Sequence, residues 1–120
     1  MEYLLLVCDD PEAEPYDRDQ DNIGAWVDEV QSRGIQKFGN RLRPPQDATT
    51  VRRRGDQLLV TDGPFAETRE QIAGFDILDC KDLDEAIDIA SRHPMARFGR
   101  IEIRPFWPLT LDETGRPVES

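Results

Sequence analysis

Residues 58–65 read Leu-Leu-Val-Thr-Asp-Gly-Pro-Phe, and the rest of the chain is organised around this stretch. Its apolar start predicts a buried strand. Gly63 tolerates a positive φ and Pro64 has no N–H group for a β-ladder, so the strand is expected to end in a turn there. Asp62 would then stand at a strand end, where its carboxylate is either aimed at a ligand or used in a plain Asp-Gly turn.

Periodic patterns on both sides of this stretch predict the other elements. Residues 49–54 and 57–61 form a β-hairpin around Gly55-Asp56. The continuous apolar run at 3–8 predicts a central strand covered on both faces, and Gly39 predicts a bulge or a bend in its own strand. The remaining strands are expected at 35–43, 74–80 and 100–106, and the helices at 20–33 and 83–93. Helices this short need a common sheet to cover, which favours an antiparallel sheet with both helices on one face.

Both predicted helices carry recognisable end signals. Trp26 lies on the apolar stripe of the first helix, so we expect it in the core, and Gly34 stops that helix. Asp82 is a suitable N-cap for the second helix, with Glu85 three residues later. His93 follows in the last turn of this helix, where a positive charge would suit the negative end of the helix dipole.

Composition narrows the class of protein. The length of 120 residues suits one domain, and 25 acidic against 15 basic residues give a net charge of −10. Such a surface disfavours direct binding of nucleic acid or anionic membranes. The start lacks a signal-peptide pattern, so we expect a soluble, cytoplasmic protein. Cys8 and Cys80 are then expected as reduced core residues.

Several motifs in order resemble the DGPF-motif branch of the YCII-related family: Asp62-Gly63-Pro64-Phe65 with the residues to 75, then 82–87, 93–97 and 101–105. The resemblance covers residues 1–107 and leaves 108–120 as a C-terminal extension. It implies an α+β fold of the ferredoxin-like type, with an antiparallel sheet, two helices on one face and an extra β-hairpin. It also implies a homodimer of the dimeric α/β-barrel type. The role of the family is mostly undefined: some relatives look like small-molecule enzymes, and others occur beside extracytoplasmic-function sigma factors.

Acid–base chemistry needs a titratable group held in a cleft, and the turn stretch offers three candidates. Asp62 is the best placed, and Glu67 and Glu70 follow it in the same loop. Two carboxylates held close together raise the pKa of one of them, which gives an acid and a base near neutral pH. The alternative is that all three are solvated surface charges.

Ligand contacts are predicted from the same loop and from neighbouring elements. Arg104, on the last strand, either clamps an anionic ligand or forms a structural ion pair. The family's proposed catalytic His–Asp pair does not carry over, because the first helix has no histidine and the residue before Pro94 is His93. One histidine and two distant cysteines predict no metal site, and no cofactor motif appears. The ligand-binding candidates are Trp26, Arg43, Gly63, Pro64, Phe65, Arg69, His93 and Arg104.

Two functions of different classes follow. The first is a small-molecule-binding protein or cofactor-free enzyme with acid–base chemistry at the DGPF loop, acting on an anionic or aromatic ligand. The second is a non-catalytic regulatory module associated with a sigma factor, which an acidic surface would serve by masking a basic partner.

Overall fold

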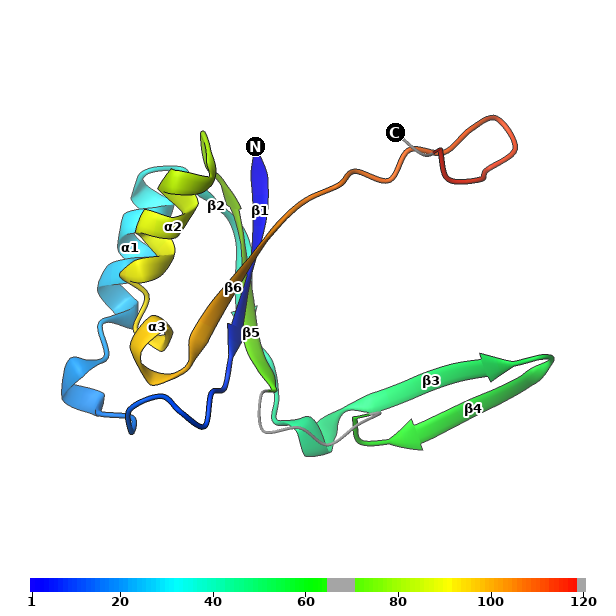
Figure 1. Ribbon diagram of the computed structural model, residues 1–120, viewed down its shortest axis with the longest axis horizontal. Helices are drawn as coiled ribbons and strands as arrows, with labels where there is room; N and C mark the ends of the chain where they lie inside the picture. Colours follow the sequence, from blue (N-terminus) through cyan, green and yellow to red (C-terminus); the bar gives the residue numbers. More distant parts are fainter. Residues whose placement is uncertain (65–70, 119–120) are drawn as a thin grey trace.

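The computed structural model describes residues 1–64 and 71–118 (Figure 1). Its elements follow in the order β1 (Glu2–Cys8), α1 (Ile23–Ser32), β2 (Gln36–Arg41), β3 (Thr49–Arg54), β4 (Gln57–Asp62), β5 (Ile72–Asp79), α2 (Leu83–Ser91), α3 (Met95–Phe98) and β6 (Arg100–Pro105). Short 3-10 turns at Arg18–Gln20 and Pro45–Asp47 precede α1 and β3. The fold is therefore α+β, as the sequence predicts.

The main sheet has the strand order β2-β5-β1-β6, and every neighbouring pair is antiparallel. The helices cover one face of this sheet (Figure 1). β1 is a central strand, as predicted, but only one of its faces is covered within the chain. Tyr3, Leu5 and Val7 are buried, whereas Leu4 and Leu6 remain half-buried on the opposite face. Burial on both faces was the wrong expectation, because no second layer of the described chain covers Leu4 and Leu6.

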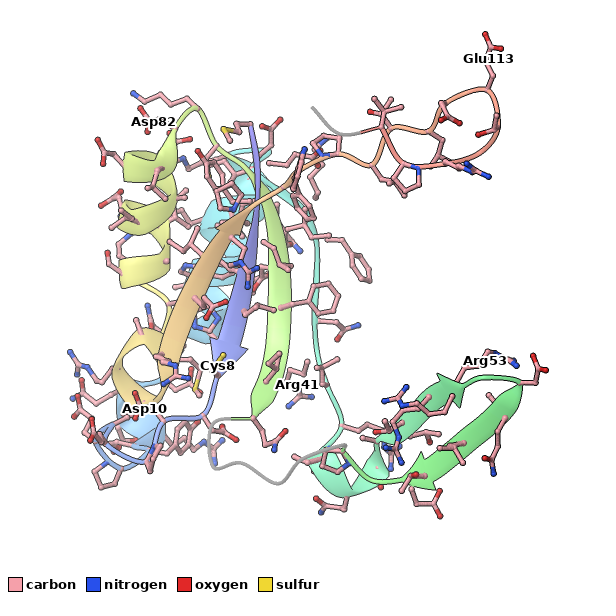
Figure 2. All side chains as sticks on the ribbon, turned by 45° about the vertical axis from the view of Figure 1, so that its right-hand side comes forward. Cys8, Asp10, Arg41, Arg53, Asp82 and Glu113 are labelled. Atoms are coloured by element: carbon pink, nitrogen blue, oxygen red, sulfur yellow. The ribbon has the colours of Figure 1, made fainter. Side chains whose placement is uncertain are left out.

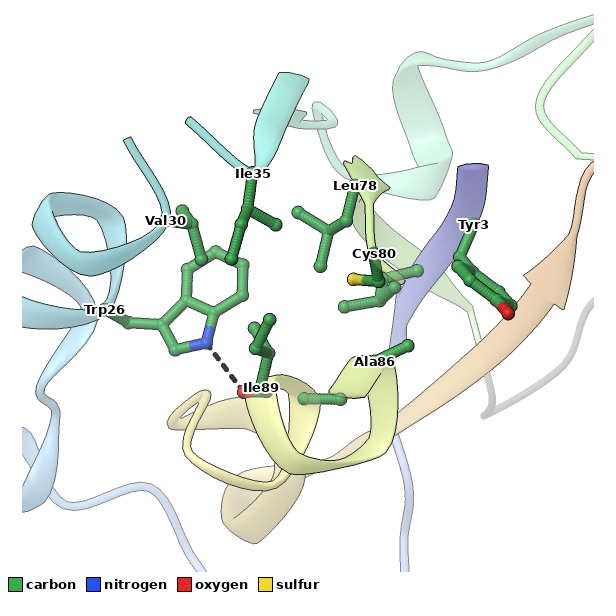
Figure 3. Close-up of a cluster of buried hydrophobic side chains, with 10 residues drawn as sticks. Tyr3, Trp26, Val30, Ile35, Leu78, Cys80, Ala86 and Ile89 are labelled. Carbon is green, nitrogen blue, oxygen red and sulfur yellow. Dashed lines mark hydrogen bonds between the residues drawn. The ribbon is translucent and has the colours of Figure 1, made fainter. Parts of the chain in front are cut away.

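The hydrophobic core lies between the helices and the sheet (Figure 3). Trp26 is 2% exposed there, and its indole Nε1 donates a hydrogen bond of 2.9 Å to the carbonyl oxygen of Ile89 (Figure 3). This bond ties α1 to α2 in addition to the apolar contact. Cys8 and Cys80 are buried free thiols, as expected for core residues.

The signals at Gly34 and Asp82 act as predicted, although the helix ends differ by a few residues. α1 stops before Gly34, whose φ is +67°, and the Asp82 carboxylate caps α2 by accepting from the N–H of Glu85 at 2.9 Å. Pro94 begins a separate short helix, α3, which the sequence did not predict. A bulge expected at Gly39 is instead an irregularity of pairing between Gln36 and Phe38.

The predicted hairpin is present, but it is not buried. β3 and β4 form their own two-stranded sheet, which projects away from the main sheet on the side opposite the helices (Figure 1). Leu58 and Val60 are 54% and 60% exposed. The apolar run correctly predicted a strand. The predicted burial of that strand was wrong, because burial requires a neighbouring layer and the described chain supplies none.

Candidate functional site

A cavity of about 490 Å³ lies between α1 and the helix-covered face of the sheet. Ile23 and Val27 on α1 and Pro94 and Met95 beyond α2 form apolar walls. Two ionisable side chains that line it, Asp76 and His93, are buried. Further polar lining comes from Asp21, Gln31, Gln36, Asn40 and Arg41. This cavity combines apolar walls with buried titratable groups, which is typical of a small-molecule site.

Asp76 comes from the middle of β5 and is 7% exposed. It has the same parity as Leu78 in the strand, so its carboxylate is on the helix-covered face. Its Oδ1 accepts a hydrogen bond of 2.8 Å from Nε2 of Gln36. Loss of hydration raises the pKa of Asp76 to about 6, and the bond from Gln36 opposes this rise.

The glycine opposite Asp76 explains how the carboxylate fits between two strands. Gly39 on β2 pairs with Asp76 on β5. A Cβ atom on residue 39 would collide with Oδ1 of Asp76 and with the amide of Gln36. Gly39 therefore leaves the space in which the carboxylate lies, which is a close approach rather than the predicted bulge.

His93 lies between α2 and α3 and is 6% exposed. Its Nδ1 accepts a hydrogen bond of 3.0 Å from the backbone N–H of Met95, so the proton of the neutral ring is on Nε2. The ring meets Trp26 edge-on, with centroids 4.6 Å apart. Burial lowers the pKa of His93 to about 4, although the negative charge of Asp21 opposes the shift. A charged helix-end role for His93 was therefore the wrong expectation, because the buried ring is neutral at physiological pH.

The two groups differ in what they can do chemically. Near neutral pH, Asp76 is ionised but more basic than an ordinary aspartate, so it can accept and return a proton. Neutral His93 can donate a hydrogen bond through Nε2–H without carrying charge. Arg41, at the end of β2, adds a cation to the lining. The arrangement suits an acid–base step on an apolar molecule that carries an ionisable oxygen.

The structure places the predicted turn residues elsewhere. Asp62 is the last residue of β4 and is exposed, and it does not line the cavity. Gly63 has a φ of +93°, as its predicted turn requires, and its carbonyl oxygen accepts from Oγ1 of Thr50 at 2.8 Å. Pro64 is half-buried beside it. Phe65, Glu67, Arg69 and Glu70 lie outside the described residues.

The predicted basic contacts and Trp26 also lie away from the cavity lining. Arg43 is on the surface, where its Nε is 2.9 Å from Oδ2 of Asp47. Arg104 forms a surface ion pair with Glu102, with 3.1 Å between Nη1 and Oε2. Trp26 packs behind His93 rather than along the cavity. Of the predicted site residues that are described, His93 alone lines the cavity.

Asp76 is the site residue that sequence reasoning missed. A signal was present, because Asp76 shares the buried parity of Leu78 and Cys80 in a strand with an apolar flank. An ionisable side chain at such a position is buried only where something accommodates it.

Within residues 1–64 and 71–118, no group of three or more His, Cys, Asp or Glu side chains is arranged to hold a metal ion. Every helix in the same part of the chain is too short or too polar to cross a lipid bilayer.

Comparison with known proteins identifies a family and several similar chains. The model of the YCII-related domain matches residues 1–110. An uncharacterised protein of Rhizobium meliloti (strain 1021), R00369, is 46% identical over 67 residues, and the match spans 54% of each chain, about half the length of that relative.

A solved structure of 5-chloro-2-hydroxyhydroquinone dehydrochlorinase (TftG) from Burkholderia phenoliruptrix AC1100, in complex with 2,5-dihydroxybenzoquinone, is also similar. Its TM-score is 0.47 at 13% identity, over 97% of this chain and 100% of that one. A likeness of this degree carries no information about activity. The family match, by contrast, covers nearly the whole chain, and the protein described here belongs to the YCII-related family.

Proposed function

We propose that this protein binds a small molecule in the cavity between α1 and the sheet and acts on it as a cofactor-free acid–base enzyme. The observation that carries the proposal is the presence of two buried ionisable side chains, Asp76 and His93, on one cavity. Burying ionisable groups costs stability, and perturbed groups in a cleft are typical of functional sites.

Asp76 serves as the proton acceptor in this proposal. A base with a pKa of about 6 remains ionised at pH 7, yet it holds a proton more strongly than an ordinary aspartate does. Returning the proton is then also accessible near neutral pH. His93 stabilises negative charge that develops on a ligand oxygen by donating from Nε2, and it does so as a neutral group.

The lining indicates the class of ligand. Ile23, Val27 and Met95 favour an apolar or aromatic body, whereas Arg41 favours an anionic or hydroxyl substituent. A hydroxylated aromatic acid combines both features. The DGPF-loop version of the proposal, with Asp62 as base, remains a competing prediction that the same experiments address.

The assembly completes the proposal. The strand order β2-β5-β1-β6 with a helix after β1 and another after β5 is consistent with a ferredoxin-like domain. We propose that two such domains pair through their uncovered sheet faces as a homodimer of the α/β-barrel type. The regulatory alternative, a module linked to a sigma factor, has no observation in its favour.

The test compares two aspartates that differ in placement. Isothermal calorimetry and thermal shift with a panel of hydroxylated aromatic carboxylates measure binding to the wild type, to Asp76→Asn and to Asp62→Asn. Asn can still accept the bond from Gln36, so the first substitution removes the charge and keeps the shape. The neutral amide is a weaker hydrogen-bond acceptor for a ligand hydroxyl than the carboxylate. We therefore expect Asp76→Asn to weaken stabilisation of the protein by the ligand and Asp62→Asn to leave it unchanged. The reverse result would move the site to the DGPF turn.

A further inference from the structure

The β3–β4 hairpin lacks the support that a hairpin normally needs. Among the described residues, its two strands pair only with each other, in register from Thr49 opposite Asp62 to Arg54 opposite Gln57. It projects from the body on the side opposite the helices (Figure 1). An isolated two-stranded hairpin is marginally stable in water, so this arm is expected to pack against something.

One face of the arm carries three apolar side chains, together with Arg53 opposite Leu58. Because side chains alternate along a strand, Val51 on β3 lies on the same face as Leu58 and Val60 on β4. Val51 and Val60 are direct cross-strand partners. The three side chains are 64%, 54% and 60% exposed, and together they form a contiguous apolar surface in the middle of the arm.

A complementary apolar surface lies on the main sheet. Leu4, Leu6, Phe75 and Ile77 are half-buried on the face that the helices leave uncovered, and Phe38 beside them is 57% exposed. The arm and the C-terminal segment both project on this side of the sheet (Figures 1 and 2). The chain therefore presents an uncovered sheet face that is flanked by two extended segments.

The dimensions of the chain indicate how much surface awaits a partner. The accessible surface is 9061 Å², roughly 2,400 Å² more than a compact monomer of 13.8 kDa exposes. The radius of gyration is 17.3 Å, against about 14 Å for a compact domain of this length. Hiding such an excess on each of two copies would bury an area in the range of obligate dimers, about 2,000–5,000 Å².

Charge favours a second copy of this chain as the partner. Residues 41–62 contain five arginines and three aspartates, so the arm and its base carry +2 in a chain whose net charge is −10. The body of another copy is therefore strongly acidic and attracts the arm. A two-fold axis satisfies both copies at once, because each arm then lies on the body of the other.

We propose that the β3–β4 hairpin is an intersubunit clasp, which packs its Val51, Leu58 and Val60 face onto the rim of the uncovered sheet face of a second copy, beside the area where the two sheets meet. The clasp rests on the dimer of the proposed function and adds a defined contact to it. Among the sheet residues named for its docking face, Phe75 also lines the cavity. The dimer dissociation constant and the ligand-induced thermal shift are measured separately, so loss of the clasp and loss of ligand binding are distinguished.

The test uses two adjacent exposed residues on opposite faces of β4. Val60→Lys places a charge on the apolar face, and Thr61→Lys places the same charge on the other face. Sedimentation velocity over a concentration series measures the dimer dissociation constant of each. We expect Val60→Lys to raise it at least about 100-fold, since the substitution acts twice in a two-fold interface, and Thr61→Lys to change it little.

A second measurement keeps the proposal testable if Val60→Lys folds poorly. Hydrogen exchange of the wild type should show β3 and β4 amides protected in the dimer and exchanging rapidly on dilution to monomer. A wild-type protein that is monomeric at all concentrations, or equal effects of the two lysines, would overturn the clasp. Binding of a labelled DNA duplex that Arg53→Glu abolishes would also overturn the clasp, because the arm would then be a nucleic-acid-binding surface.

Discussion

Gly39 and Asp76 face each other across the pairing of β2 with β5, and the Asp76 carboxylate lies where a side chain on residue 39 would stand. Gln36, three residues before Gly39 on the same strand, donates to that carboxylate. One strand thus supplies both the space and the hydrogen bond for a buried acid. The position of the candidate base depends on the smallest residue in β2.

Replacing Gly39 by alanine should destabilise the protein by about 1–3 kcal/mol, because the new Cβ must displace a buried carboxylate. Urea unfolding measures the change. The matched control is Gly24→Ala on α1, where nothing lies within 4 Å of the added Cβ, and where helix propensity predicts a gain of up to about 1 kcal/mol. A Gly39→Ala protein with wild-type stability and wild-type ligand binding would contradict the close approach of the Asp76 carboxylate to residue 39.

The stability of Asp76→Asn relative to wild type should increase by about 2–3 kcal/mol between pH 4 and pH 8. The folded-state pKa of Asp76, about 6, lies above the ordinary value of 3.8. The native state therefore holds more protons than the unfolded state between these values, and stability falls as pH rises through this window. Urea titrations of both proteins from pH 4 to 8 give the difference in their free energies of unfolding. The contributions of the other carboxylates are the same in both proteins and cancel in this difference. A pH-independent difference would show that Asp76 titrates normally.

The single histidine should remain neutral far below its ordinary pKa. Burial lowers the pKa of His93 to about 4, so its side-chain NMR signals should stay constant from pH 8 to 5 and report the Nε2–H form. The unfolded state gains a proton near pH 6.5, so the contribution of His93 to stability is complete above that pH and is lost as pH falls toward 4. A midpoint near 6.5 in the folded protein would contradict the buried position.

Trp26→Phe should cost about 1–3 kcal/mol, since it removes the indole donor and leaves the buried carbonyl of Ile89 without that partner. Trp107→Phe is the matched control, because Trp107 is 75% exposed and its replacement should change the free energy of unfolding by less than about 0.5 kcal/mol. Chemical denaturation followed by circular dichroism avoids dependence on the altered tryptophan. Equal losses in the two variants would argue against the α1–α2 bond.

The site could be predicted only in part from the sequence. His93 could be singled out as the lone histidine, but its helix-end position suggested a charge that burial forbids. Asp62 was favoured because a Gly-Pro turn follows it, and local turn chemistry does not reveal whether a cavity lies beside it. Asp76 becomes a candidate only when α1 and β2 are placed against β5, since Gln36 and Asp76 are forty residues apart.

Apart from α3, local patterns in the sequence by themselves determined the elements: the hairpin around Gly55-Asp56, the stop at Gly34, the cap at Asp82 and the order of the other strands and helices. These features depend on dihedral preferences and hydrogen bonds between near neighbours, which the sequence states directly. Only the tertiary structure decided which apolar residues are covered and which charges are buried together. Burial is a property of layers that meet in space, so β1 and β4 could be recognised as strands while their exposed faces could not.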